Sequence, residues 1–361
     1  MTTKKLITLA AAAAVLGGLA YVSSNTKKLK TPTLAGKPVL TALDLSAVQR
    51  IEVSDNGQKS LILESTDNGW VMASLFGYPA DIVKIRENLL ALSGLKIGQV
   101  ATGKKLDHAR VVDLQNASGK SLATLRLGDM HLREATGQMA MYGGGAYPDG
   151  RYVATEGDTV YLVSDTLDAF DGDPKRWTDT QIATVPRDQI IAAEYTVDGE
   201  TLKLEKKDGA WTLDGLSEQE ELDTAKLHSV DSALGYLHFN TIADPALTDD
   251  QTGMATGTVY KVTLSGGEVY TARIGNALGA DRYFKISAAF TPPATAIEAD
   301  APHPQQEAQN LQNKLRAAAV EELNATAGKW TYLIPSHTAA NMAKRRADVV
   351  KAKEAPKPEE E

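Results

Sequence analysis

The chain has 361 residues, a formal net charge of -8 and no cysteine. The absence of cysteine excludes disulfides, cysteine-ligated zinc, iron–sulfur clusters, thiol nucleophiles and a lipoprotein anchor. Acidic residues are spread along the chain and only 6% of residues are aromatic, so nucleic acid is not expected as a partner. The apolar fraction of 43% is enough for one large domain or two of medium size.

The first 22 residues have the layout of a signal anchor or a signal peptide. An uncharged run of 17 residues, Leu6 to Val22, is flanked by lysines (Lys4, Lys5, Lys27, Lys28 and Lys30). As a helix this run spans about 25 Å, slightly less than a hydrocarbon core of about 30 Å. We predict that it anchors an exported body to the membrane. Small residues after Val22 leave cleavage, and a soluble exported protein, as the alternative.

A three-strand pattern ending in a tryptophan occurs twice in the body. In the first occurrence, strands near Val48 to Val53 and Leu61 to Glu64 precede the turn Asp67-Asn68-Gly69 and Trp70. In the second, strands near Gln189 to Tyr195 and Leu202 to Glu205 precede Asp208-Gly209-Ala210 and Trp211. Turn residues of this type between apolar runs predict β-hairpins. The equivalent positions of Trp70 and Trp211 favour a packing role over ligand stacking.

Each hairpin is followed by a helical pattern that begins at an acidic residue, Asp81 or Asp223. Apolar residues at helical spacing follow in both copies: Ile82, Ile85, Leu89 and Leu92, then Leu227, Val230, Leu234 and Leu237. We expect each helix to cover one face of a sheet.

Further strands complete both copies. Leu122 to Gly128 resembles Val269 to Gly275, and Arg151-Tyr152-Val153 resembles Arg282-Tyr283-Phe284. Thr159 to Val163 corresponds to Trp330 to Ile334, and an amphipathic helix near residues 305–326 is inserted before that last strand.

The predicted fold class is therefore α+β: two tandem copies of an antiparallel sheet unit with one packed helix each, behind the N-terminal signal-anchor helix. The predicted boundaries are 1–22 for the anchor, 23–42 for an extended linker, 43–180 and 181–337 for the two copies, and 338–361 for a disordered charged tail.

At these residues the chain resembles the domain-of-unknown-function 4340 family, roughly from Leu43 to Ile334. The resemblance rests on Ile51-Glu52-Val53, Asn68-Gly69-Trp70, Asp81, Leu127-Gly128, Tyr152-Val153, and Arg176 with Asp179. It implies a bacterial protein anchored in the inner membrane with its body in the periplasm. Such proteins are often encoded beside ABC-type export systems related to gliding machinery. The family defines no catalytic residue.

No constellation for catalysis or metal binding is evident. The six histidines (His108, His131, His228, His238, His303 and His337) lack metal-ligand spacing. Asp165, Asp168, Asp171 and Asp173 could suggest calcium, but the loop lacks the alternating ligands and closing glutamate, so a solvated acidic loop is expected. Gly143-Gly144-Gly145 lacks the lysine of a phosphate loop and is interpreted as a hairpin tip.

These observations favour a non-enzymatic envelope protein that has no cofactor and binds protein partners, as an accessory component of an ABC-type transport system. A binding module for cell-wall polymer or a small ligand, and a hydrolase with an unrecognised site, are the alternatives. No catalytic, cofactor-binding or metal-binding residue is assigned.

Overall fold

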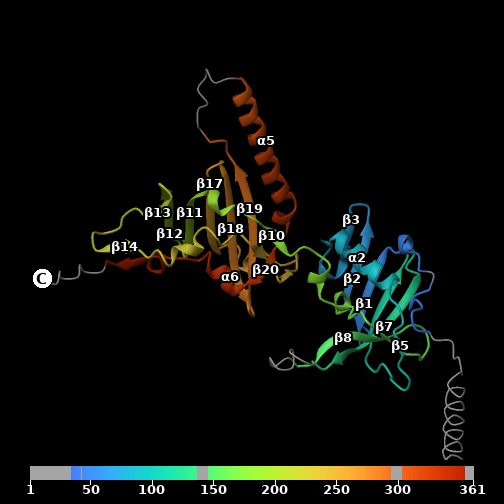
Figure 1. The fold of residues 1–361 in the computed structure, drawn as a ribbon. Helices are drawn as coiled ribbons and strands as arrows, with labels where there is room; N and C mark the ends of the chain where they lie inside the picture. Colours follow the sequence, from blue (N-terminus) through green and yellow to red (C-terminus); the bar gives the residue numbers. More distant parts are fainter. Residues whose placement is uncertain (1–33, 42, 136–144, 294–302, 354–361) are drawn as a thin grey trace, which may run out of the picture. The chain divides into compact units, whose positions relative to one another are not determined.

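The computed structural model describes residues 34–41, 43–135, 145–293 and 303–353, and consists mostly of antiparallel β-sheet with few helices (Figure 1). The α+β fold class predicted from the sequence is confirmed at this level. No helix in the described residues is long and apolar enough to cross a membrane. The predicted anchor, residues 1–22, lies outside the described residues.

Two large sheets contain most of the strands. The order in the nine-stranded first sheet is β4 (Tyr78–Pro79), β3 (Gly69–Met72), β2 (Gln58–Thr66), β1 (Arg50–Asp55), β6 (Arg110–Gln115), β7 (Ser121–Arg133), β8 (Tyr147–Ala154), β9 (Tyr161–Val163), β5 (Gln99–Val100). The order in the eight-stranded second sheet is β13 (Ala210–Thr212), β12 (Glu200–Lys207), β11 (Ile190–Val197), β17 (Thr258–Leu264), β18 (Glu268–Leu278), β19 (Asp281–Phe290), β20 (Tyr332–Pro335), β16 (Thr241–Ile242).

Two small sheets and a few helices complete the described fold. The small sheets pair β10 (Gln181–Ala183) with β15 (Leu237–His238), and β14 (Glu220–Leu222) with β21 (Val350–Ala352). The α-helices are α2 (Ile82–Ser93), α4 (Asp249–Thr252), α5 (His303–Ala325) and α6 (Ser336–Ala340). Short 3₁₀ turns lie at Leu45–Ala47, Ala73–Leu75, Asp168–Phe170, Pro174–Arg176, Arg187–Gln189, Leu227–Ser229, Ala327–Lys329 and Arg346–Asp348.

Contacts divide the chain into two compact units. Unit 1 contains Met1–Val48, Ser54–Gln58 and Asn88–Asp171, and unit 2 contains Gln49–Val53, Lys59–Glu87 and Gly172–Glu361. The second sheet therefore lies wholly in unit 2. The domain limits of 43–180 and 181–337 stay a prediction.

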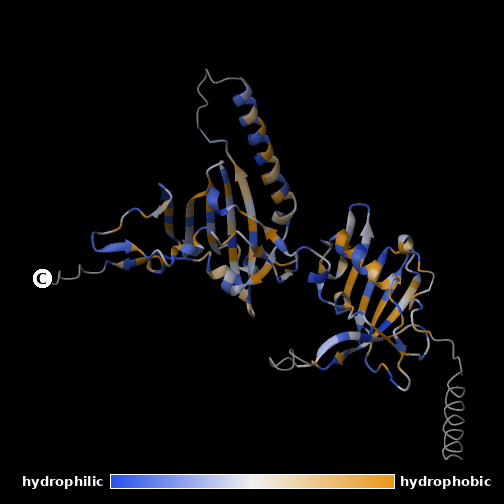
Figure 2. Ribbon diagram, viewed as in Figure 1, coloured by the Kyte–Doolittle hydropathy of each residue, from blue (hydrophilic) through white to orange (hydrophobic). Residues whose placement is uncertain are grey.

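Turns with positive φ set the hairpins. Asp198 and Gly199, between β11 and β12, have φ values of 51° and 84°, and Asp208 and Gly209, between β12 and β13, have 53° and 82°. Asp and Gly are the residues that tolerate this left-handed conformation in two-residue hairpin turns. Apolar and polar residues alternate along several strands, as the orange and blue bands of Figure 2 show, because successive side chains of a strand point to opposite faces of the sheet.

The helix predicted after the first hairpin is present, but its second counterpart is not. Asp81 Oδ1 accepts a hydrogen bond from Val83 N at 2.8 Å at the start of α2, which buries Ile85, Leu89 and Leu92 while leaving Ile82 half exposed. Between Asp223 and β15 the segment contains only the turn Leu227–Ser229 and further turns, although Leu227, Val230 and Leu234 are buried. Leu237 is buried as the first residue of β15.

Residue types and ion pairs account for the absence of the second helix. The Ser232 hydroxyl donates to His228 O at 2.9 Å, Gly235 N donates to Ser232 O at 3.0 Å, and Asp231 forms ion pairs with side chains of other elements. Serine, aspartate and glycine are poor helix formers because they offer such competing arrangements or added backbone freedom. The apolar spacing therefore predicted burial correctly and helix incorrectly.

The later strands are present where the sequence predicted them, and both sheets carry a bulge at the matching place. The register shifts between Leu127 and Met130 in β7 and between Ile274 and Ala277 in β18. Beside each bulge an arginine of the next strand donates its Nε–H to a glycine carbonyl, Arg151 to Gly128 at 2.9 Å and Arg282 to Gly275 at 3.0 Å. A Cβ on either glycine would clash, at 2.4 Å from Leu106 Cδ2 or 2.1 Å from Thr252 O.

The inserted helix is confirmed as α5, which projects from the second sheet in Figure 1.

The segments predicted as a linker before the body and as a disordered tail after it both contain ordered, buried residues. In the predicted linker, Val39 and Leu40 are buried, and Val39 N donates to Leu95 O at 2.8 Å.

The predicted disordered tail is wrong for residues 338–353. Met342 and Val349 are fully buried and β21 pairs with β14, because apolar side chains in this charged segment find a place in unit 2. Residues 354–361 lie outside the described residues.

The tryptophans marking the hairpins are not core residues. Trp70 and Trp211 occupy equivalent positions, opposite Ser65 in β2 and Lys206 in β12, but both are only half-buried. Lys206 Nζ lies 4.9 Å from the centroid of the Trp211 ring, a cation–π contact. The tryptophan with 0% exposure is Trp177, so the packing role predicted for Trp70 and Trp211 is not that of fully buried core residues.

Replacement of Trp177 by alanine should therefore lower the free energy of unfolding by about 3–5 kcal/mol, because it empties a fully buried site. Trp70→Ala and Trp211→Ala should each cost about 1–2 kcal/mol. Urea unfolding followed by circular dichroism measures all three losses. Equal losses at the three positions would show that Trp70 and Trp211 contribute as much stability as a fully buried tryptophan.

Candidate functional site

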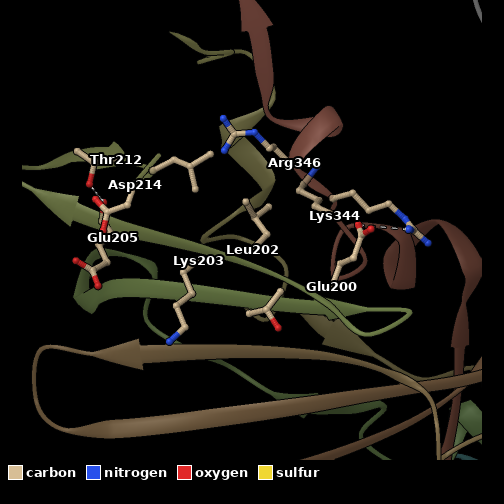
Figure 3. Close-up of a pocket in the computed structure, with 11 residues that line it drawn as sticks. Glu200, Leu202, Lys203, Glu205, Thr212, Asp214, Lys344 and Arg346 are labelled. Atoms are coloured by element: carbon tan, nitrogen blue, oxygen red, sulfur yellow. Dashed lines mark hydrogen bonds and ion pairs between the residues drawn. The ribbon is translucent and has the colours of Figure 1, made fainter. Parts of the chain in front are cut away.

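A groove of about 470 Å³ lies at the β12–β13 edge of the second sheet, entirely within unit 2 (Figure 3). Its floor is β12 and its far rim is the segment Lys344–Arg346, close to the chain's end. The lining residues are Glu200, Thr201, Leu202, Lys203, Glu205, Thr212, Leu213, Asp214, Lys344, Arg345 and Arg346.

The groove exists because β13 is much shorter than β12. β13 pairs only with Glu205 to Lys207, which leaves the first five residues of β12 without a strand on that side. The ladder with β11 pairs Val197 with Glu200 across the two-residue turn. In an antiparallel ladder hydrogen-bonded and non-hydrogen-bonded pairs alternate, so the N–H and C=O groups of Thr201 and Lys203 point away from β11 and into the groove.

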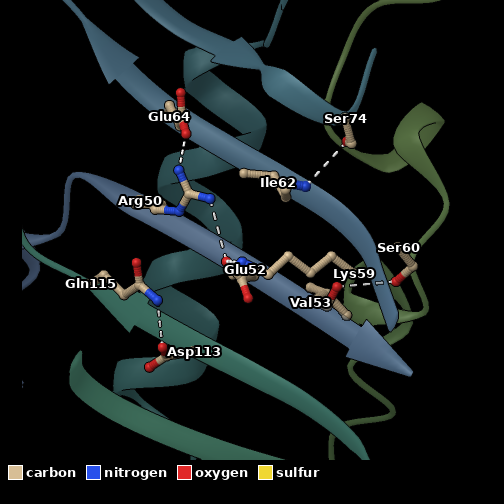
Figure 4. A network of polar contacts seen from close by, with 10 residues as sticks. All are labelled: Arg50, Glu52, Val53, Lys59, Ser60, Ile62, Glu64, Ser74, Asp113 and Gln115. Carbon is tan, nitrogen blue, oxygen red and sulfur yellow. Dashed lines mark hydrogen bonds and ion pairs between the residues drawn. The ribbon is translucent and has the colours of Figure 1, made fainter. Parts of the chain in front are cut away.

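The corresponding edge of the first sheet is occupied. Counting from the two tryptophans, Ile62 in β2 corresponds to Lys203 in β12. Ile62 N donates to Ser74 Oγ at 3.1 Å, as Figure 4 shows, so this outward N–H group already has a partner. Beside it, the outer face of β1 and β2 carries an ion-pair network of Arg50, Glu52, Lys59 and Glu64. The outward N–H group of β2 at this position is thus satisfied within the first sheet, whereas the described residues give no such partner to Lys203 N in the second.

Ion pairs fix the far rim of the groove. Arg345 pairs with Asp198 in the β11–β12 turn, and its Nη1 lies 3.9 Å from Glu200 Oε2. Arg346 Nη2 donates to Glu220 Oε2 at 2.7 Å and to Gly215 O at 3.0 Å. Two arginines therefore connect the end of the chain to segments more than 120 residues earlier.

The two ends of the groove differ in charge. In Figure 3 Lys344, Arg346 and Glu200 lie on one side, and Glu205, Thr212 and Asp214 lie on the other; Glu200 lies near Arg345. Lys344 forms no ion pair with another described residue. Unpaired peptide groups between charged ends are what an extended polypeptide needs in order to add a strand to a sheet. The arrangement therefore suits a peptide segment with an acidic residue near Lys344 and a basic residue near Asp214.

Sequence reasoning missed this groove. Its floor lies in a strand that the sequence predicted, but its rim comes from the predicted disordered tail. The signal available in the sequence was the apolar Met342 just before the basic run Lys344-Arg345-Arg346.

The carboxylates of the acidic loop noted in the sequence accept hydrogen bonds from backbone N–H groups and form ion pairs with arginines. Asp171 Oδ1 lies 2.7 Å from both Arg110 Nη1 and Arg151 Nη1. Asp165 accepts from Leu167 N at 2.8 Å and Asp173 from Lys175 N at 3.0 Å. The described residues contain no cluster of three or more His, Asp or Glu side chains able to hold a metal ion.

None of the described histidines lines the groove. His131 Nδ1 lies 2.5 Å from Asp149 Oδ1 on the β7–β8 hairpin, His238 Nδ1 lies 2.9 Å from Thr180 Oγ1, and His228 Nδ1 lies 3.5 Å from Arg187 Nη2. Gly143 and Gly144 of the glycine run lie outside the described residues.

Comparison with known protein families gives one match. A family model described as "Domain of unknown function (DUF4340)" matches residues 70–255, just over half of the 361 residues. The chain belongs to the DUF4340 family. No curated protein and no solved structure matches it. The matched residues of this DUF4340 protein include the floor of the groove and exclude its Lys344–Arg346 rim.

A buried polar cluster lies where the segment around Asp231 meets β11, β12 and β17 of the second sheet of the DUF4340 protein. Asp231 is buried, and its two oxygens lie 2.6 Å from Arg187 Nε and 3.0 Å from Lys206 Nζ. In the same cluster, the rings of Tyr195 and Tyr260 lie 4.8 Å apart, and the Tyr260 hydroxyl donates to Val230 O. Burial raises the pKa of both tyrosines above the ordinary value, and the charge of Asp231 acts in the same direction.

This cluster predicts a loss of stability at alkaline pH. Phenols in the unfolded chain ionise near pH 10, whereas Tyr195 and Tyr260 stay neutral in the folded protein. Their stabilisation is complete below about pH 10 and is lost as the pH rises, by about 1.4 kcal/mol per pH unit for each phenol. Tyr195→Phe should make the decline in the free energy of unfolding less steep, as measured by urea unfolding between about pH 8 and 11. An unchanged slope would contradict the raised pKa.

Proposed function

We propose that this DUF4340 protein is a non-enzymatic, membrane-anchored protein of the bacterial envelope. In this proposal, its body lies in the periplasm and the groove of the second sheet binds an extended segment of a partner protein by strand addition. The partner is a subunit of an ABC-type transport system, to which the chain is an accessory component. The observation that carries the proposal is the open edge of β12 at Thr201 and Lys203.

The chemistry of the groove supports a protein segment as the ligand. In strand addition, hydrogen bonds to main-chain groups give affinity without requiring a particular sequence. The charged ends of the groove would fix the register of the added strand. Thr201 and Lys203 are exposed, so a strand can approach them without displacing core residues.

Anchoring is supported by the sequence of the first 30 residues, where lysines flank the uncharged run Leu6 to Val22. The transport role is supported by the genomic company of the family that the sequence resembles. Both support placement in the inner membrane with the body in the periplasm.

We also propose that the body is two diverged copies of one unit. With β4 set aside, the strand orders of the two sheets correspond one to one, from β3 and β13 to β5 and β16. The same bulge and the same arginine-to-glycine hydrogen bond occur in β7–β8 and in β18–β19. In this interpretation the first copy closed its strand edge with Ser74, and the second kept its edge open for a partner.

A matched pair of lysines tests the binding function. Lys203 and Lys261 both pair with Glu194, at 3.3 and 3.6 Å, but only Lys203 lines the groove. A photo-crosslinking amino acid at position 203 of the full chain, in native membranes, should capture transporter subunits that mass spectrometry identifies. The same amino acid at position 261 should not.

Capture of the same neighbours from both positions, or of none from position 203, would contradict binding in the groove. Circular dichroism of each purified variant confirms that the sheet is intact. Because each substitution removes one ion pair with Glu194, the two variants should lose equal stability, about 0.2–1 kcal/mol.

A further inference from the structure

One face of α5 is fixed to the second sheet. Arg316 Nε lies 3.3 Å from Glu268 Oε1, and Val320 is buried. The Asn324 side chain makes two hydrogen bonds with the backbone of Ala288 in β19, accepting from N at 2.9 Å and donating to O at 2.8 Å. These contacts hold the carboxyl-terminal part of the helix and determine which face points outward.

The opposite face of α5 carries an apolar stripe. The outer stripe consists of Ala308, Leu311, Leu315 and Ala318, all exposed, with Leu311 at 59% and Leu315 at 63% exposure. The spacings of three, four and three residues place all four on one helix face, as the a and d positions of two heptads. Exposed leucines repeated at this spacing mark a helix-packing surface rather than scattered surface residues.

The outer stripe reads the same in both directions. Alanine, leucine, leucine and alanine are arranged symmetrically about position 313. Two antiparallel copies would therefore pack Leu311 on Leu315 and Ala308 on Ala318, twice each. A two-fold interface requires this self-complementarity, in which one patch contacts its own copy.

We propose that the outer stripe of α5 pairs with the same stripe of a second copy in an antiparallel helix pair. The two leucine layers form its centre, and the alanines allow close approach at both ends. Antiparallel packing also brings the positive end of each helix dipole beside the negative end of the other. This inference is independent of the function proposed for the groove.

The pair should be weak and dependent on concentration. In a standard interface each partner buries about 800 Å² of surface, and a stripe of four residues buries less than this. Tethering to one membrane would raise the local concentration of copies.

Sedimentation of the full chain in detergent tests the association. The weight-average mass of the protein should rise towards twice the monomer value over a series from about 1 μM to about 1 mM. Leu311→Glu with Leu315→Glu should shift the midpoint of that rise at least tenfold to higher concentration. Leu278→Glu is the matched control, because Leu278 is also an exposed leucine of unit 2, at 52% exposure, and lies in β18. A monomer throughout, or an equal shift in the control, would overturn the proposal.

Cysteine crosslinking tests the orientation and does not require a destabilising substitution. The chain has no cysteine, so single variants give an unambiguous result. Ala308→Cys mixed with Ala318→Cys should form a disulfide-linked heterodimer at least tenfold faster than Ala308→Cys forms a homodimer. Faster homodimer formation would indicate parallel helices and overturn the antiparallel pair.

Discussion

The antiparallel ladder between β11 and β12 determines which side chains of these strands are buried and which peptide groups of β12 face the groove. Its register is set by the Asp198-Gly199 turn, whose two positive φ values join Val197 directly to Glu200. From that register follow both the inward face, where Tyr195 is buried, and the outward peptide groups of β12. A shift of one residue would reverse both at once. The groove is therefore a property of the sheet rather than of any one side chain.

Two further features turn this edge into a site. β13 ends after three residues, and the end of the chain returns to bind the same turn through Arg345. The first sheet has the same strand order at this place but closes its edge, because Ser74 accepts the N–H of Ile62. One architecture thus gives a closed edge and an open edge, which fits the proposed division of roles between the two copies.

The sequence predicted what depends on neighbouring residues. Alternating apolar residues and Asp-Gly turns located the strands and hairpins, and Asp81 located the start of α2. The sequence-based prediction failed where contacts between residues distant in the sequence decide the local structure. Asp231 forms ion pairs with Arg187 and Lys206 and lies in turns rather than in a helix, and the rim of the groove forms only when the chain's end reaches β12. No local pattern contains these contacts, so neither the absent helix nor the groove was predicted.

Residue-resolved hydrogen exchange of the free protein tests the open edge most directly. In β12, the amides of Leu202 and Leu204 donate to β11, whereas those of Thr201 and Lys203 face the groove. The account predicts slow exchange at Leu202 and Leu204 and exchange at least tenfold faster at Thr201 and Lys203. Equal protection of all four amides would show that the edge is already paired and would contradict a groove built for an added strand.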